Sequence, residues 1–168
     1  SAVGDAQINN FNIGNAGNDK HVNATFQATV DAAGDIVFQG SSSDAEHEIT
    51  FDSQNGAMNV DAGIAGSNNS TDTVVYKGGA TITQTVDVGT TGDLENLDVE
   101  GNNTTLDVDG ATVQTENPIT IGDNAIIKAS GASPTFEADI HGNSGTFVAD
   151  AGTTTVKGDL GDSDNRLS

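Results

Sequence analysis

The sequence predicts an all-β protein, on two observations. Between residues 94 and 160, short pairs of aliphatic residues are split by one polar residue, as in Leu97-Asp98-Val99 and Ile119-Thr120-Ile121. Residues two positions apart lie on the same face of a strand, so each pair gives its strand one apolar face. Glycines also recur at positions 101, 110, 122, 131, 142 and 152. Such regular spacing is typical of one strand and one turn in an all-β domain.

The favoured architecture is a β-solenoid (β-helix) of short strands joined by Gly/Asn/Asp turns. The alternative is a β-sandwich of the Greek-key or jelly-roll type, which uses the same alternating strands. No segment has a convincing 3.6-residue apolar period, so no helix is predicted. The two prolines, Pro118 and Pro134, fall beside turns, where they suit strand starts better than strand interiors.

The strand signals can be followed along the chain in order. Strands are expected at 7–13, within 22–30, and at 36–38, 48–52, 73–76 and 80–88. Further strands are expected around the pairs that begin at Leu97, Leu106 and Ile119, and then at Phe136, Ile140 and Phe147. Residues 41–46 are expected to be a loop. Residues 63–72 form the most loop-like segment and are expected to be an exposed excursion or hinge.

The chain of 168 residues is long enough for one domain with a real core, and no linker is evident. Similar phrases recur in the same order, such as residues 56–63 and 145–152, but at unequal offsets. One interpretation is a single domain, 1–168, made of two degenerate copies, about 1–89 and 90–168. The other is chance similarity in a chain rich in Gly, Asp and Thr.

The composition limits the partners. The chain has 5 basic and 25 acidic residues, for a net charge of −20, and no cysteine. Such a surface is a poor partner for nucleic acid, which requires clustered Lys and Arg, and for anionic membranes. There is no apolar run of 18 residues, so no transmembrane helix and no direct membrane insertion are expected. Disulfides, thiolate metal sites and cysteine nucleophiles are excluded.

Two phrases carry a resemblance to a known group of proteins. Residues 86–97, VDVGTTGDLENL, and 157–167, KGDLGDSDNRL, resemble repetitive modules of large bacterial surface proteins. The style is similar to the passenger region of rickettsial-type autotransporters and to some surface-layer proteins and adhesins. The resemblance covers about residues 80–168. It implies an all-β module outside the cell, used for coating, adhesion or filament assembly, and it supplies no catalytic residues.

The function expected from these observations is that of a non-enzymatic, secreted structural module of a bacterial surface assembly: a surface layer, filament or adhesin stalk. It would self-associate through strand edges or ends into a homo-oligomer or polymer, with residues 7–13 as a candidate donor strand. The alternative is an adhesin domain that binds a glycan or a host or cell-surface protein through residues 63–72. No Gly-x-Ser-x-Gly elbow or His-x-Glu-x-x-His pattern indicates an enzyme.

Candidate metal ligands are few. Asp159, Asp162 and Asp164 lie in one Gly-containing turn, and hard oxygen ligands so close together suit Ca²⁺. The EF-hand pattern is absent, and a solvated polar tail is the other interpretation. The run 46–48, Glu-His-Glu, is either a local cation cluster or a solvated strand entry. The acidic pairs at 98/100 and 107/109 are expected to face solvent.

Overall fold

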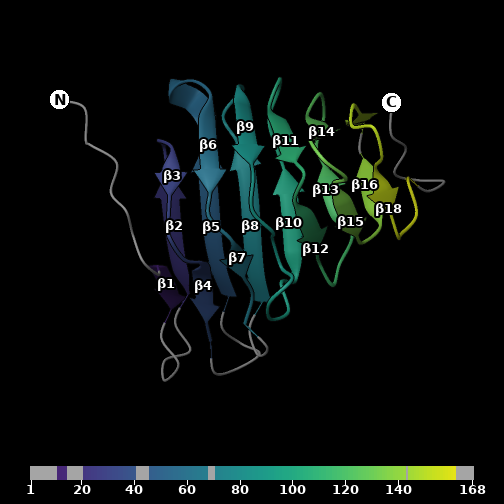
Figure 1. Cartoon of the computed structure of the whole chain (residues 1–168). Coiled ribbons are helices and arrows are strands. Elements are labelled where there is room, and N and C mark those ends of the chain that lie inside the picture. Colours follow the sequence, from purple (N-terminus) through teal and green to yellow (C-terminus); the bar gives the residue numbers. More distant parts are fainter. Residues whose placement is uncertain (1–10, 15–20, 41–45, 68–70, 143, 162–168) are drawn as a thin grey trace.

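The alternating pairs form strands that each pair in parallel with a strand one turn of the chain away. The computed structural model describes residues 11–14, 21–40, 46–67, 71–142 and 144–161. Within these residues the chain winds through three sheets in turn, and the strands stack side by side from the N-terminal to the C-terminal end (Figure 1). The protein is therefore a β-solenoid. The sandwich alternative is wrong, because sandwich sheets are antiparallel and every pairing between strands here is parallel.

We name the three faces sheets 1, 2 and 3, in the order in which the chain visits them. Sheet 1 contains β1 (Phe11–Gly14), β4 (Ile36–Gln39), β7 (Ile64–Ala65), β12 (Thr112–Gln114), β15 (Thr135–Glu137) and β18 (Thr155–Val156), with Val88 bridging β7 and β12. Sheet 2 contains β2 (Val22–Phe26), β5 (Glu46–Asp52), β8 (Thr71–Lys77), β10 (Asn96–Val99), β13 (Ile119–Ile121) and β16 (Ile140–Gly142). Sheet 3 contains β3 (Val30–Asp31), β6 (Met58–Asp61), β9 (Thr81–Gln84), β11 (Thr105–Asp109), β14 (Ile126–Ser130) and β17 (Thr146–Ala149).

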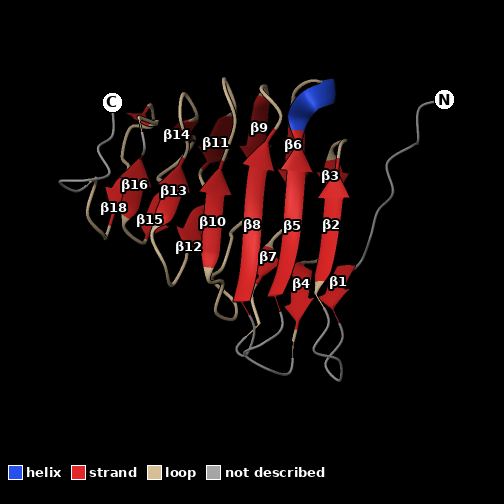
Figure 2. Cartoon of the chain, turned by 180° about the vertical axis from the view of Figure 1, so that it is seen from behind, coloured by secondary structure: helices blue, strands red, loops and turns tan. Residues whose placement is uncertain are grey.

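One short 3-10 turn, η1 (Ser53–Asn55), joins β5 to β6 and is the only helical element among the described residues (Figure 2). Asp52 caps it, because its side chain accepts a hydrogen bond from the backbone N–H of Gln54 at 3.1 Å. The buried Ser53 hydroxyl lies within hydrogen-bonding distance of the carbonyl groups of Lys77 and Ala80 and accepts from the N–H of Ala80. The corner between sheets 2 and 3 is thus tied to the next turn.

Successive turns of the solenoid become shorter along the chain. In the first turns Val22 pairs with His47, whereas in the last ones Thr135 pairs with Thr155. One turn therefore takes about 25 residues at the start and about 20 at the end, near the lower limit for stacked repeats. Figure 1 shows the solenoid narrowing towards the C-terminal end. Because the turns are unequal, the sequence has no fixed period that a repeat search could recognise.

The core is a set of columns in which inward side chains from successive turns stack along the axis. The register places Phe26, Phe51, Tyr76, Val99, Ile121 and Gly142 in one column of sheet 2. In sheet 3 a column contains Met58, Ile82, Leu106, Ile127 and Phe147. The low aromatic content is concentrated at the N-terminal end, where Phe51 stacks on Phe26 at 5.6 Å and on Tyr76 at 5.3 Å between ring centroids.

Most predicted strands are confirmed within the described residues, and residues 7–10 and 41–45 lie outside them. The prediction for 63–72 is wrong over 63–67, because Ile64–Ala65 is strand β7 and all five residues are buried. It is also wrong at Thr71 and Asp72, which begin strand β8, with Asp72 fully buried. Residues 68–70 lie outside the described residues. The strands β6, β12, β14 and β18 are additional to those predicted.

The matched phrases at 56–63 and 145–152 occupy equivalent places, since Met58 and Phe147 share one column of sheet 3. Other matched positions do not occupy equivalent places. Phe51 and Phe136 match in the sequence, but Phe51 lies in sheet 2 and Phe136 in sheet 1. The repeating unit defined by the register is a single turn. A division into two copies stays a prediction.

Candidate functional site

The predicted calcium turn is only partly described. Asp159 is exposed, and its backbone N–H donates to Asp139 Oδ1 at 2.8 Å. Asp162 and Asp164 lie outside the described residues. Among the residues that the structure describes, no three His, Cys, Asp or Glu side chains are grouped to hold a metal ion. The calcium site stays a prediction.

The predicted cluster at 46–48 is divided between two faces of β5. The side chains of Glu46 and Glu48 face solvent, whereas His47 turns inward and is 1% exposed. Strand alternation requires this split, so a cation cluster of the three side chains is excluded. Glu46 and Glu48 border a shallow surface hollow of about 240 Å³ between β2 and β8. Neither ring nitrogen of His47 has a hydrogen-bond partner.

A buried polar node lies deeper in the same part of the solenoid. Gln84 is fully buried in an aliphatic column of sheet 3. Its Nε2 donates to the carbonyl groups of Ala62 and Val86 at 2.9 and 2.7 Å, and its Oε1 accepts from the Tyr76 hydroxyl at 3.0 Å. Burial raises the pKa of the Tyr76 phenol far above its ordinary value. The polar atoms of both side chains are satisfied, so the node is structural.

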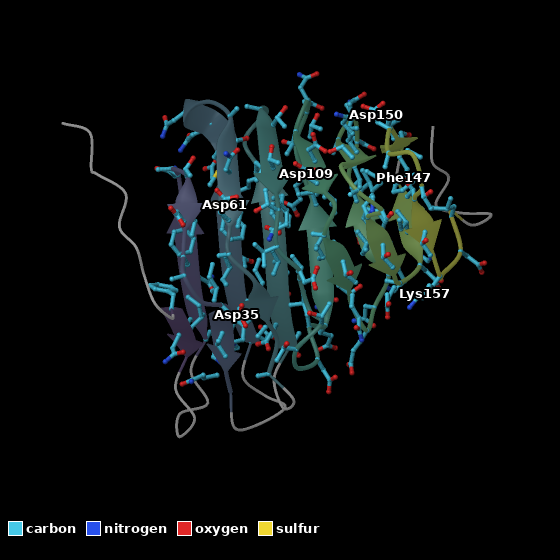
Figure 3. All side chains as sticks on the ribbon, in the orientation of Figure 1. Asp35, Asp61, Asp109, Phe147, Asp150 and Lys157 are labelled. Atoms are coloured by element: carbon cyan, nitrogen blue, oxygen red, sulfur yellow. The ribbon has the colours of Figure 1, made fainter. Side chains whose placement is uncertain are left out.

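Acidic residues follow the outer face of sheet 3 along its length (Figure 3). Asp31 pairs with Asp61, and Asp109 lies further along the same sheet. The Thr85 hydroxyl donates to Asp61 at 2.5 Å, and Lys128 lies 3.4 Å from Asp107 and 3.2 Å from Asp150. Parallel strands are about 4.8 Å apart, so such carboxylates repel unless hydroxyl or ammonium groups intervene. These contacts offset part of the repulsion along the acidic face.

The acidic pairs at 98/100 and 107/109, expected to face solvent, differ in exposure. Glu100 and Asp109 are exposed, but Asp98 and Asp107 are only partly so. Burial raises the pKa of Asp98, a hydrogen bond with Thr120 lowers it, and repulsion from Glu48 adds to the rise. The cause is its place in sheet 2, whose outward side chains cover one another. The sequence could not show this, because the neighbours come from other turns.

The two ends of the solenoid are the most distinctive surfaces. Eight apolar side chains pack against the core while only partly buried, and all lie in the first turn or the last ones: Phe11, Val22, Ala24, Phe26 and Ala32, then Ala138, Phe147 and Val156. In the column of Phe26, the next two members, Phe51 and Tyr76, are fully buried. Val148 and Leu160 are 39% and 52% exposed at the C-terminal end. The apolar columns thus continue to both ends without a complete cover.

The end strands carry few of the side chains that protect sheet edges. Natural edge strands are commonly guarded by Lys, Pro, inward charges or bulges, and also by being very short, as β3 and β18 are with two residues each. The six strands that end the sheets are β1, β2, β3, β16, β17 and β18. Among them Asp31 is the only carboxylate, and there is no Lys, Arg or Pro. In a chain with a net charge of −20, these strands are the places where a further strand meets least repulsion.

Strand addition at these edges would use backbone groups that have no partner strand among the described residues. The candidate donor segment 7–13 is partly engaged already, because Phe11–Ile13 belongs to β1, which pairs with β4. Residues 7–10 lie outside the described residues. The alternation in 22–26 is visible in the sequence, but the position of β2 at an edge is not. That position depends on which strands stack.

Comparison with known proteins identifies no relative: no family model, curated protein or solved structure matches the chain. Among the described residues, no helix is long and apolar enough to cross a membrane. The function must therefore be inferred from the solenoid and its ends.

Proposed function

We propose that the protein is a non-enzymatic structural module of an extracellular bacterial surface assembly, and that it associates through the ends of its solenoid. The observation that supports this most is the state of the end turns. Their inward apolar side chains are partly uncovered, and their strands carry one carboxylate and neither Lys nor Pro. Covering them with further β-strands removes apolar surface from water and pairs backbone groups.

The body of the solenoid also suits a building material. Its interior is filled with stacked side chains, and its buried polar node is satisfied within the chain. The hollows bordered by described residues have volumes of about 240, 430 and 140 Å³. The first lies over β5, and the other two lie along the corner between sheets 1 and 2. A stack in which each turn contacts only its neighbours is the arrangement of extended repeat proteins.

The extracellular and bacterial part of the proposal has different support. The resemblance of residues 80–168 to surface-protein modules favours it, and the acidic composition without cysteine is compatible with it. A surface layer, a filament and an adhesin stalk would all use a rod with associating ends. The adhesin alternative relied on an exposed binding segment at 63–72, but residues 63–67 are buried.

Sedimentation equilibrium over a wide concentration range tests the association. We expect the average mass to rise above 17.0 kDa with concentration. The double variant Thr25→Lys/Val148→Lys places a lysine on an outward position of β2 and of β17 and should stay monomeric. Asn59→Lys, on an exposed outward position of β6, which is not an end strand, is the control and should associate normally. A wild-type monomer at all concentrations would contradict the proposal.

Lysine changes are chosen because they lower the net negative charge of the chain. General repulsion between two molecules therefore falls in every variant, and a loss of association can come only from the edge itself. Far-ultraviolet circular dichroism of each variant confirms that the β-solenoid is retained.

A further inference from the structure

We infer that the first turn is the main association surface, and that two copies pair N-terminal end to N-terminal end about a two-fold axis through the middle of β2. This inference depends on the proposed function, because it names the partner and the geometry of the end-to-end contact. It predicts a closed dimer at that end in place of an open, head-to-tail filament.

The first turn has more partly exposed side chains packed on the core than the last turns, five against three. Its three strands, β1, β2 and β3, each lie at the edge of a sheet. Inward residues of two of them, Phe11, Val22, Ala24 and Phe26, are all partly exposed. At the other end, Leu160 bridges to Ile140 and so gives β16 one further contact in sheet 2. The outer edges of β18 and β17 lack a partner strand among the described residues, as those of the first turn do.

Head-to-tail stacking would join unlike surfaces. A parallel continuation would place Phe26 of the next copy in the column that ends at Gly142, which offers no side chain to the ring. It would also set the longer first turn of one copy on the shorter last turn of another. A symmetric contact joins two turns of equal length, and the partly exposed Phe26 ring of each copy takes part in it. Closed two-fold contacts are also the commonest kind in protein oligomers.

The residues of β2 are self-complementary in an antiparallel pair centred on Ala24. Ala24 then faces Ala24 of the second copy, and Val22 faces Phe26, so inward side chains meet inward side chains. Phe26 already stacks on Phe51 and meets Phe11 edge-on at 5.4 Å between ring centroids, and Val22 of the second copy would cover the part of the ring that stays exposed. The small Ala24 at the centre allows close approach.

The same axis brings β1 of one copy alongside β3 of the other, since it exchanges sheets 1 and 3. Asp31, the one carboxylate in the first-turn strands, then lies near the uncharged residues of β1. The two Asp31 side chains stay apart, on opposite sides of the axis. A pairing that put β3 on β3 would instead bring like charges together.

Single-cysteine cross-linking tests this geometry, because the natural chain has no cysteine. Ala24→Cys lies on the proposed axis, where directly opposed residues have the Cα separation that a disulfide needs. In a glutathione redox buffer, we expect Ala24→Cys alone to form a covalent dimer. Val30→Cys, in β3 of the same end, should not link to itself.

A mixture of Val30→Cys and Ala149→Cys reports the head-to-tail arrangement, since Val30 and Ala149 share one column of sheet 3. Cross-linking in this mixture, without linkage of Ala24→Cys, would overturn the inference while the proposed function stands. Association by sedimentation with neither linkage would also overturn it. A wild-type chain that never associates would instead refute the proposed function itself. Circular dichroism confirms the fold of each variant.

Discussion

The N-terminal and C-terminal parts of the solenoid fill their interiors differently. The early, longer turns enclose a stack of aromatic rings and the buried polar side chains of His47, Asp72 and Gln84. The last, shorter turns are lined mainly by Ile, Ala and a pair of phenylalanines in edge contact. A longer turn encloses more space, which large rings and buried polar side chains fill. A shorter one needs fewer large side chains to fill it.

The difference also sets how much each region depends on its neighbours. Phe51 lies between two rings and is fully buried, whereas Phe147, at the other end, packs on the core while partly exposed. The middle of a solenoid is stabilised from both sides, and its ends from one. A mutation in an inner turn should therefore lower the free energy of unfolding more than a similar mutation in an end turn.

The largest effect is expected for Phe51→Ala. Removing a fully buried ring leaves a cavity in a stack that cannot collapse, and should lower the free energy of unfolding by about 3–5 kcal/mol. Phe147→Ala removes a partly exposed ring and should cost about 1 kcal/mol, since less apolar area is lost. Urea unfolding followed by circular dichroism measures both. Equal costs would contradict the contrast between middle and end.

A smaller effect is expected at the polar node of the early turns. Tyr76→Phe removes the hydroxyl that donates to Gln84 Oε1 and leaves that buried oxygen without a partner. The free energy of unfolding should fall by about 1–3 kcal/mol, since the lost bond leaves an unsatisfied buried acceptor. Gln84→Leu leaves the Tyr76 hydroxyl and the carbonyl groups of Ala62 and Val86 without this partner, so it should cost more than Tyr76→Phe. A Gln84→Leu variant no less stable than Tyr76→Phe would show that the node acts by packing alone.

The smallest effect concerns Asp98, between the two regions. Its pKa is raised in the folded state, mainly by burial, so the folded chain holds that proton more tightly than the unfolded chain. Stability is therefore lost as the pH rises from the ordinary value of 3.8 through the raised pKa, and the loss is complete at neutral pH.

Asp98→Asn should thus be more stable than the natural chain at pH 7, by about 0.5 kcal/mol after screening by solvent, and no more stable at pH 3. Asp107→Asn is the matched control, since Asp107 lies 3.4 Å from Lys128 and its change should give no gain. Thermal unfolding at the two pH values measures the difference. A gain of the same size at both would show that the charge of Asp98 is not the cause.

The strand content of this fold was predictable because alternation and turn residues are local signals. Leu106-Asp107-Val108 identifies its strand without reference to the rest of the chain. Gly101, Gly110 and Asn124 have positive φ values, as expected for residues in tight turns. Gly122 and Gly152 also follow strands but have no positive φ value. Short strands such as Ile64–Ala65 were missed, because two residues carry no period.

What the sequence could not supply was register across turns of unequal length. Solenoid and sandwich use the same alternation, and they differ in which strands, far apart in the chain, become neighbours. For the same reason the candidate surface was not predicted. The strand at 22–26 was recognised, but its position at a sheet edge depends on the stacking of all the others.

Hydrogen exchange at β2, compared between dilute and concentrated solution, tests the central claim most directly. The free amides of Val22–Phe26 should gain protection as concentration rises, while those of the middle strand Thr105–Asp109, paired with β9 and β14, should not change. Exchange at β2 that is independent of concentration, in a sample that sediments as a monomer, would contradict the account.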